Sequence, residues 1–182
     1  YFSIDNMYPD VPHHTILFGQ TYRKVLDKIF NKLELPEDLS IYLHRPSATD
    51  PGCAPPGHDS FYALVPVPNL RSDIAWPDVE HDFKAALLEA LSDRILPGLK
   101  DCIVDESFVT PEYFSKELLT PWGAGFSITP TLLQSAGFRF PNRATTLSNL
   151  YFKGAGTHPG AGVPGVVTSA KVVERLMFGS VQ

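Results

Sequence analysis

Residues 154–176, GAGTHPGAGVPGVVTSAKVVERL, contain five glycines and two prolines that run directly into an apolar helical pattern. The preceding residues 147–153, LSNLYFK, predict a buried strand. Glycine permits close backbone approach, and Pro164 suits the first turn of a helix. The segment therefore predicts a strand, a long loop and a helix whose free N–H groups and positive dipole end favour an anion. A purely structural turn is the alternative.

A dinucleotide-binding βαβ unit is excluded, although Gly160, Gly162 and Gly165 match the pattern G-x-G-x-x-G. That fingerprint directly follows a strand and has an acidic residue about 20 positions further on. Here the predicted strand ends near Lys153, and the nearest later acid is Glu174, inside the predicted helix. The glycines must serve another purpose.

The composition is that of a globular chain with one sizeable core. Of the 182 residues, 43% are hydrophobic and 19% are charged, and the formal net charge is −5. This balance creates no basic field, so we exclude nucleic-acid binding. Cys53 and Cys102 have no metal-binding or redox spacing, which favours a reducing, cytoplasmic location. The sequence contains no apolar run of about 18 residues and no signal-peptide pattern.

Five short β-type runs predict the strands. They cover residues 1–4, 13–18, 39–45, 60–67 and 102–109. The first of the internal runs, HHTILF, is expected to be a buried strand or strand end. We expect 39–45 to pair with 60–67, and Pro66 to move its strand towards a sheet edge. Residues 46–59 are too rich in proline and glycine for a helix and predict a long loop.

Four helices are predicted from apolar positions at helical spacing and from proline or glycine at their ends. They cover residues 22–33, 77–95, 110–118 and 164–177. Thr110 and Pro111 suit the N-cap and first residue of the third helix. The expected inward face of the last helix comprises Val166, Ala170, Val173, Leu176 and Met177. Residues 132–140 are ambiguous.

The order of residues in NLYFKGAGTHPGAGVPGVVTSA closely resembles the C-terminal signature of bacterial and fungal phytoene desaturases, FAD-dependent carotenoid dehydrogenases of the amine-oxidase-like superfamily. The likeness extends through HHTILFG, DLSIYLHRPSATDPGCAPPGHDSFYALVPVPNL, LPGL, GAGFSI and QSAGFRFPNR, and so covers nearly the whole chain. Lys153 departs from it, as a charged residue where apolar ones are expected. Because the family's N-terminal dinucleotide fingerprint is absent and the first methionine is Met7, we expect the C-terminal part of a larger enzyme.

The resemblance implies an α+β or α/β fold that forms the C-terminal portion of a two-domain flavoprotein. Residues 1–8 are expected to be a lead-in strand, and residues 9–140 a substrate domain built on a mixed β-sheet with helices. Residues 141–182 are expected to return to the FAD-binding domain as a strand, a glycine-rich loop and a helix, without the N-terminal Rossmann half. We expect this fragment alone to be inactive.

The resemblance also implies which residues bind FAD. Gly156 and Thr157 would approach the ribityl and phosphate part of the cofactor. The residues beside the isoalloxazine ring would be Val163, Pro164, Gly165 and Val166. A helix N-terminus near the N1 and C2 carbonyl edge would stabilise the charge that grows there during hydride transfer by roughly 0.3–2 kcal/mol. No catalytic residue is assigned.

The implied reaction removes two hydrogens across a C–C single bond of a long polyene, taking phytoene towards neurosporene or lycopene in carotenoid biosynthesis. Such a substrate has no polar handle, so recognition relies on an apolar tunnel, at about 0.8 kcal/mol for each buried CH₂. Candidate tunnel walls, with ordinary core packing as the alternative, are Ile41, Leu43, Phe61, Leu64, Phe138 and Phe140. Alternative functions are a sister carotenoid desaturase, ketolase or isomerase, or a non-catalytic binding domain.

The expected partners are a carotenoid substrate and a membrane surface, with a homo-oligomer as a further possibility. Helix 22–33 has a basic face opposite its apolar residues, among them Ile29 and Phe30, which is typical of an interfacial helix. Core packing is the alternative for that helix. We therefore expect a cytoplasmic enzyme peripherally associated with the membrane.

We expect no metal site. His13 and His14 are adjacent, so on a strand they point to opposite faces, which argues against a joint site. His44 and Arg45 lie beside the proline-rich loop and could meet substrate, with a solvated or hydrogen-bonded side chain as the alternative for His44. His158, inside the glycine-rich signature, could hold the loop or contact the cofactor.

Overall fold

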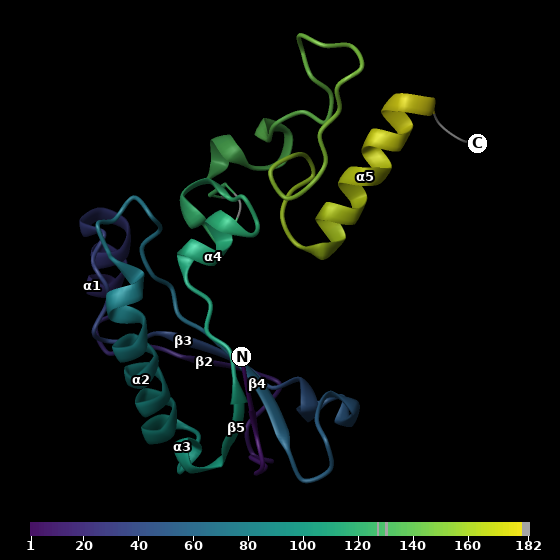
Figure 1. Cartoon of the computed structure of the whole chain (residues 1–182). Helices are drawn as coiled ribbons and strands as arrows, with labels where there is room; N and C mark the ends of the chain where they lie inside the picture. The colour runs from purple at the N-terminus through teal and green to yellow at the C-terminus, as the bar shows by residue number, and fades with distance from the viewer. Residues whose placement is uncertain (127, 130, 180–182) are drawn as a thin grey trace. The chain divides into compact units, whose positions relative to one another are not determined.

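The computed structural model describes residues 1–126, 128, 129 and 131–179 (Figure 1). These residues pack as two compact units, Tyr1–Ala124 and Gly125–Gln182. We expected substrate and flavin functions to divide near residue 140, and that functional assignment stays a prediction. Ser127 of the GAGFSI segment and positions 180–182 of the expected flavin part lie outside the described residues.

The first unit contains a five-stranded sheet with the order β2-β3-β4-β1-β5. Its strands are β1 (Phe2–Ile4), β2 (His14–Leu17), β3 (Ile41–His44), β4 (Asp59–Leu64) and β5 (Ile103–Glu106). The expected combination of helices and a sheet is confirmed, but the neighbouring strands are all antiparallel, so the expected mixed sheet is wrong. β4 and β5 both run antiparallel to β1 and are therefore parallel to each other. Because β1 lies between them, they form no parallel pair.

The core lies on one face of this sheet, beside helix α2 (Trp76–Arg94) (Figure 1). The buried residues that meet there are Phe2, Ile4, Ile41, Leu43 and Phe61 from the strands, and Leu87 and Leu91 from α2. The alternation predicted for residues 39–45 and their pairing with the 60–67 run are therefore confirmed. As candidate tunnel walls, Ile41, Leu43 and Phe61 prove to be ordinary core residues.

Two predictions about strand position are wrong. Among the described strands β2 lies at the edge of the sheet beside β3, and Ile16 is 61% exposed, so the 13–18 run is not buried. β4 lies inside the sheet and ends at Leu64. Pro66 therefore falls outside the hydrogen-bonded ladder, where it cannot disturb pairing, and it does not place its strand at an edge.

The 22–33 pattern forms two short helical pieces instead of one helix. They are α1 (Tyr22–Asp27) and a π-helical turn (Lys28–Lys32), which ends where Leu33 adopts a left-handed conformation. Val25 and Ile29 are buried, whereas Phe30 is 71% exposed. Val25 and Ile29 of the predicted apolar face therefore pack into the core, whereas Phe30 of the same face does not.

Two short helices flank β5. The first, α3 (Leu99–Cys102), takes Cys102 out of the predicted 102–109 strand. The second, α4 (Pro111–Lys116), has Thr110 at its N-cap and Pro111 in its first turn, as predicted.

The long 46–59 loop is confirmed, and it contains the 3₁₀ turns Pro46–Ala48 and Pro51–Cys53. A further 3₁₀ turn covers Pro121–Gly123.

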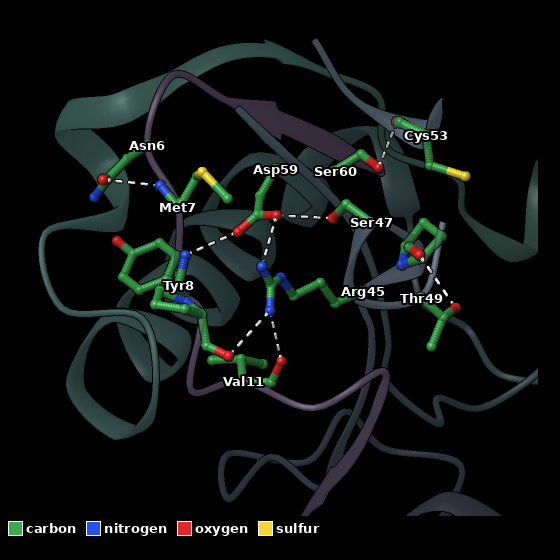
Figure 2. Close-up of polar contacts among 12 residues, drawn as sticks. Asn6, Met7, Tyr8, Val11, Arg45, Ser47, Thr49, Cys53, Asp59 and Ser60 are labelled. Atoms are coloured by element: carbon green, nitrogen blue, oxygen red, sulfur yellow. Dashed lines mark hydrogen bonds and ion pairs between the residues drawn. The ribbon is translucent and has the colours of Figure 1, made fainter. Parts of the chain in front are cut away.

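The long loop is joined to the core through the buried side chain of Asp59. Its carboxylate accepts hydrogen bonds from the Ser47 hydroxyl and the Tyr8 backbone N–H, both at 2.8 Å, and lies beside the Arg45 guanidinium (Figure 2). Arg45 is 5% exposed, so the suggestion that this side chain meets substrate is wrong.

The second unit contains helix α5 (Val163–Phe178) and the 3₁₀ turns Leu132–Gln134 and Ala136–Phe138. The strand predicted over 147–153 is wrong: residues 148 and 149 form a turn, and Tyr151 makes an isolated bridge to Arg143. Val166, Leu176 and Met177 of α5 are 37%, 45% and 50% exposed, so their predicted inward orientation is also wrong. None of the described helices is both long and apolar enough to cross a bilayer.

Candidate functional site

The glycine-rich loop, residues 154–162, leads directly into the N-terminus of α5. Its last residue, Gly162, is the N-cap and has a φ of 90°, a conformation that favours glycine. Pro164 lies in the first turn, and the Val166 N–H donates to the Gly162 carbonyl at 2.9 Å. That first turn contains no acidic residue. The positive end of the helix dipole is therefore not opposed by a carboxylate of its own first turn.

Gly165 lies against the backbone of the loop that precedes it. A Cβ atom at this position would stand 2.6 Å from the Gly160 carbonyl oxygen, a distance that real side-chain carbons do not reach. Gly160 itself is buried and has a φ of 137°. The close contact between position 165 and the Gly160 carbonyl thus requires a glycine at 165. The positive φ of Gly160 favours a glycine at that position as well.

Asn142 and Thr157 form a buried polar support beneath the loop. The Asn142 side-chain amide lies 3.2 Å from the Thr157 hydroxyl oxygen and donates to the His158 carbonyl at 2.9 Å. The Thr157 hydroxyl donates to the Gly154 carbonyl at 3.0 Å. Asn142 and Thr157 are only 5% and 7% exposed, so these bonds fix the loop from inside the unit.

Arg139 and Ser169 hold the loop at two further points. The Arg139 guanidinium donates to the Ala155 carbonyl at 2.8 Å and is 8% exposed. The fully buried Ser169 hydroxyl accepts from the Gly154 N–H at 2.9 Å and donates to the Val166 carbonyl at 2.6 Å. Through Ser169 the beginning of the loop is tied to the helix that ends it.

The predicted flavin-binding residues fall into two groups. Thr157 is buried and supports the loop, whereas Gly156 and Gly165 are half-buried. Val163, Pro164 and Val166 form an exposed first turn of α5, and Val163 is 79% exposed. The structure brings the six residues onto one loop and helix terminus, and their role in binding FAD stays a prediction.

Three supporting residues of this site escaped the sequence interpretation. Arg139 and Asn142 lie within QSAGFRFPNR. Polar side chains between phenylalanine and proline could have indicated buried hydrogen-bonding residues, but the segment contributed only to the family resemblance. Ser169 gave none, because a serine in a helix is ordinarily solvated. The backbone N–H of His158 donates to the Phe140 carbonyl at 3.1 Å, so the backbone at this position helps to hold the loop.

The prediction that His13 and His14 point to opposite faces of a strand is wrong. The rings of His13 and His14 lie on the same side of the sheet, with centroids 4.3 Å apart, and both are close to His44. His14 belongs to β2, but His13 precedes it, so strand alternation does not govern the direction of His13. The pKa of His44 is lowered, first by burial and then by the positive charges that His13 and His14 can carry.

Comparison with known proteins identifies the relatives of this chain. A neurosporene-forming phytoene desaturase of Rhodobacter capsulatus is 47% identical over 173 residues, which cover 94% of this chain and 33% of the relative. The corresponding enzyme of Cereibacter sphaeroides is 48% identical over 172 residues, covering 93% of this chain and 33% of the relative. A lycopene-forming phytoene desaturase of Pseudescherichia vulneris is 44% identical over 183 residues, covering 100% of this chain and 37% of the relative. The chain is homologous to phytoene desaturases.

The likeness to phytoene desaturases extends along both units, since it covers 93–100% of this chain in these three comparisons. The chain spans about a third of the length of these desaturases. No protein-family model matches it. The resemblance inferred from the glycine-rich signature is therefore confirmed by whole-chain identity to phytoene desaturases.

Proposed function

We propose that this chain is the C-terminal part of an FAD-dependent oxidoreductase that desaturates phytoene towards neurosporene or lycopene in carotenoid biosynthesis. The observation that carries the proposal is identity of 44–48% to phytoene desaturases along nearly the whole chain. Both neurosporene-forming and lycopene-forming relatives lie in this narrow range, so the number of desaturation steps is left open.

The proposed flavin site is the loop and first turn that hold Gly156, Thr157 and Val163–Val166. The fit to FAD rests on three features: an exposed helix N-terminus, a first turn without carboxylates, and a glycine at 165 that lets the backbone pack without side-chain atoms. FAD would supply the acceptor for a hydride removed from the substrate. The chain would contribute N–H groups and a dipole end that favour negative charge on the bound cofactor.

The proposed substrate is a long apolar polyene, so its contacts must be apolar surface. Of the candidate walls, Phe138 and Phe140 remain available, because they are 67% and 66% exposed. Leu64 lies on the sheet face opposite Phe61 by strand alternation and also remains a candidate. We assign the substrate role to residues 9–140 and the flavin role to 141–182.

We propose further that the enzyme works in the cytoplasm at the membrane surface, where its lipid-soluble substrate resides. Phe18 and Phe30 are 61% and 71% exposed, and Tyr22 packs edge-on against Phe18 at 5.5 Å. Arg23 and Lys24 of α1 supply basic charge next to this aromatic group. Exposed aromatic side chains beside basic ones are suited to a headgroup interface.

The test is an absorption spectrum of the purified full-length protein, followed by anaerobic addition of phytoene in liposomes. A bound flavin that bleaches while a longer polyene appears would establish the desaturase function. Bound flavin without bleaching would favour a sister substrate such as another carotenoid. Absence of flavin would overturn the enzyme proposal and leave the glycine-rich segment as a structural loop.

A further inference from the structure

Three histidine side chains converge on the outer face of the sheet, opposite the hydrophobic core. His14 and His44 are direct cross-strand partners in the β2–β3 pair. The His13 and His44 Nε2 atoms lie 2.7 Å apart. One ring nitrogen from each of His13, His14 and His44 lies within 4.8 Å of the other two. Such convergence of three imidazoles is the main requirement of a transition-metal site.

Hydroxyl groups lie within hydrogen-bonding distance of the Nδ1 atoms of two of these rings. The Nδ1 atom of His13 lies 2.6 Å from the Thr49 hydroxyl, and the Nδ1 atom of His14 lies 2.8 Å from the Tyr42 hydroxyl. In metal sites an outer group that accepts a hydrogen bond from the second ring nitrogen fixes the tautomer and orients the ligand. Thr49 and Tyr42 are placed to do this and leave both Nε2 atoms for an ion.

We propose that His13, His14 and His44 bind one divalent first-row transition-metal ion, of which Zn²⁺ is the representative, through their Nε2 atoms. Three imidazoles would leave one position of a tetrahedral ion for water or another ligand. The ion would connect the edge strand β2 to β3 and, through Thr49, to the 46–59 loop.

Metal binding requires one pair of nitrogens to open and lets the His14 nitrogen, which lies within 4.8 Å of the other two, move closer by rotation of its side chain. At Zn–N distances of about 2.0–2.1 Å, tetrahedral ligands lie roughly 3.3 Å apart. The 2.7 Å separation between the His13 and His44 Nε2 atoms must therefore lengthen by about 0.6 Å, which side-chain rotation can supply. His14 lies on an exposed edge strand, so an ion can reach the cluster from solvent.

Proton placement is consistent with binding. A hydrogen bond between the two Nε2 atoms requires one of them to carry a proton, whereas metal ligation requires both to be bare. The proton can move to Nδ1 of the same ring, and for His13 the Thr49 hydroxyl oxygen would then accept it. At His13, ligation thus exchanges one tautomer for another and keeps a partner at Nδ1.

The experiment is calorimetric titration of the full-length, chelator-treated protein, carrying no histidine tag, with Zn²⁺. A parallel titration with Co²⁺ records its visible absorption. We expect one ion per chain and the intense visible bands of tetrahedral Co²⁺. His13→Ala and His44→Ala should each weaken binding by more than about tenfold, and Thr49→Val, which alters only the outer partner, by about tenfold.

His81→Ala serves as the matched control, because His81 is a surface histidine on α2 with a side chain 87% exposed. This control should bind Zn²⁺ as the unaltered protein does. If a His44 variant fails to fold, His14→Ala on the exposed edge replaces it. Lack of stoichiometric binding, or equal affinity in the His13, His14 and unaltered proteins, would overturn the proposal. Flavin content is measured in every variant, so failure of the metal site is distinguished from failure of the proposed flavin site.

Discussion

The Arg45 guanidinium and the Asp59 carboxylate form a buried ion pair, with nitrogen and oxygen 3.0 Å apart and side chains 6% and 0% exposed (Figure 2). Arg45 also donates to the Val11 carbonyl at 2.9 Å, and Asp59 accepts from Tyr8 and Ser47. The pair therefore connects the N-terminal segment, the end of β3, the long loop and the start of β4. Because both charges are removed from water, each depends on the other for compensation.

Loss of either partner should strongly destabilise the protein. For Arg45→Met or Asp59→Leu we expect the free energy of unfolding to fall by about 3–5 kcal/mol, since an unpaired charge would stay buried. Urea denaturation measures this change. Lys28→Met is the control: it breaks a pair with Glu37, whose side chain is 92% exposed, and should cost about 0–1 kcal/mol.

The double variant Arg45→Met/Asp59→Leu separates charge burial from packing. It should recover part of the stability lost in the single variants, because no unpaired charge remains. Single variants within about 1 kcal/mol of the unaltered protein would contradict the role given to this pair.

Gly165→Ala should disrupt the glycine-rich loop. The new Cβ would stand 2.6 Å from the Gly160 carbonyl oxygen, so the loop or the first turn of α5 must shift. We expect loss of bound flavin from the full-length protein, measured by its absorbance after gel filtration. Gly137→Ala is the control in the same unit, because a Cβ there meets nothing within 4 Å. Equal flavin content in both variants would argue against the assigned site.

Stability should fall in acid partly through Asp38. Hydrogen bonds from the Thr21 backbone N–H and then from its hydroxyl, at 2.5 and 2.8 Å, lower the pKa of Asp38 below its ordinary value of 3.8. The ionised carboxylate therefore stabilises the folded state above pH 3.8, and this contribution disappears as pH falls through the lowered pKa. Asp38→Asn should have a flatter decline in urea midpoint between about pH 5 and about pH 3. A parallel decline in both proteins would refute this.

Membrane binding should depend on the exposed aromatic side chains near α1. Phe18→Ser/Phe30→Ser should weaken liposome binding of the full-length protein by roughly tenfold or more, since each phenylalanine contributes apolar area to the interface. Sedimentation with anionic liposomes measures it. Ile29 is unsuitable for this test because it is 4% exposed and its substitution would disturb the interior. Tyr113→Ser, at an exposed aromatic residue on α4, is the control; an equal loss in this variant would show that the effect is not local.

Features set by neighbouring residues could be predicted from the sequence. The alternation of Leu39, Ile41 and Leu43, the helix over 76–94, and the glycine-rich approach to α5 all follow from periodicity or turn chemistry within a few residues. The order of residues in the glycine-rich segment also indicated the phytoene desaturase family. Of the candidate site, the loop and helix N-terminus could be predicted, but its buried supports Arg139, Asn142 and Ser169 could not.

Only the tertiary structure decided how distant segments meet. It placed β1 between β4 and β5, brought His13 and His14 to His44, and buried Arg45 against Asp59. These arrangements depend on strand register and packing between residues far apart in the chain, and local periodicity carries no information about either. The sequence by itself determined most of the helices and strands and the resemblance to phytoene desaturases, whereas packing determined which polar side chains become partners.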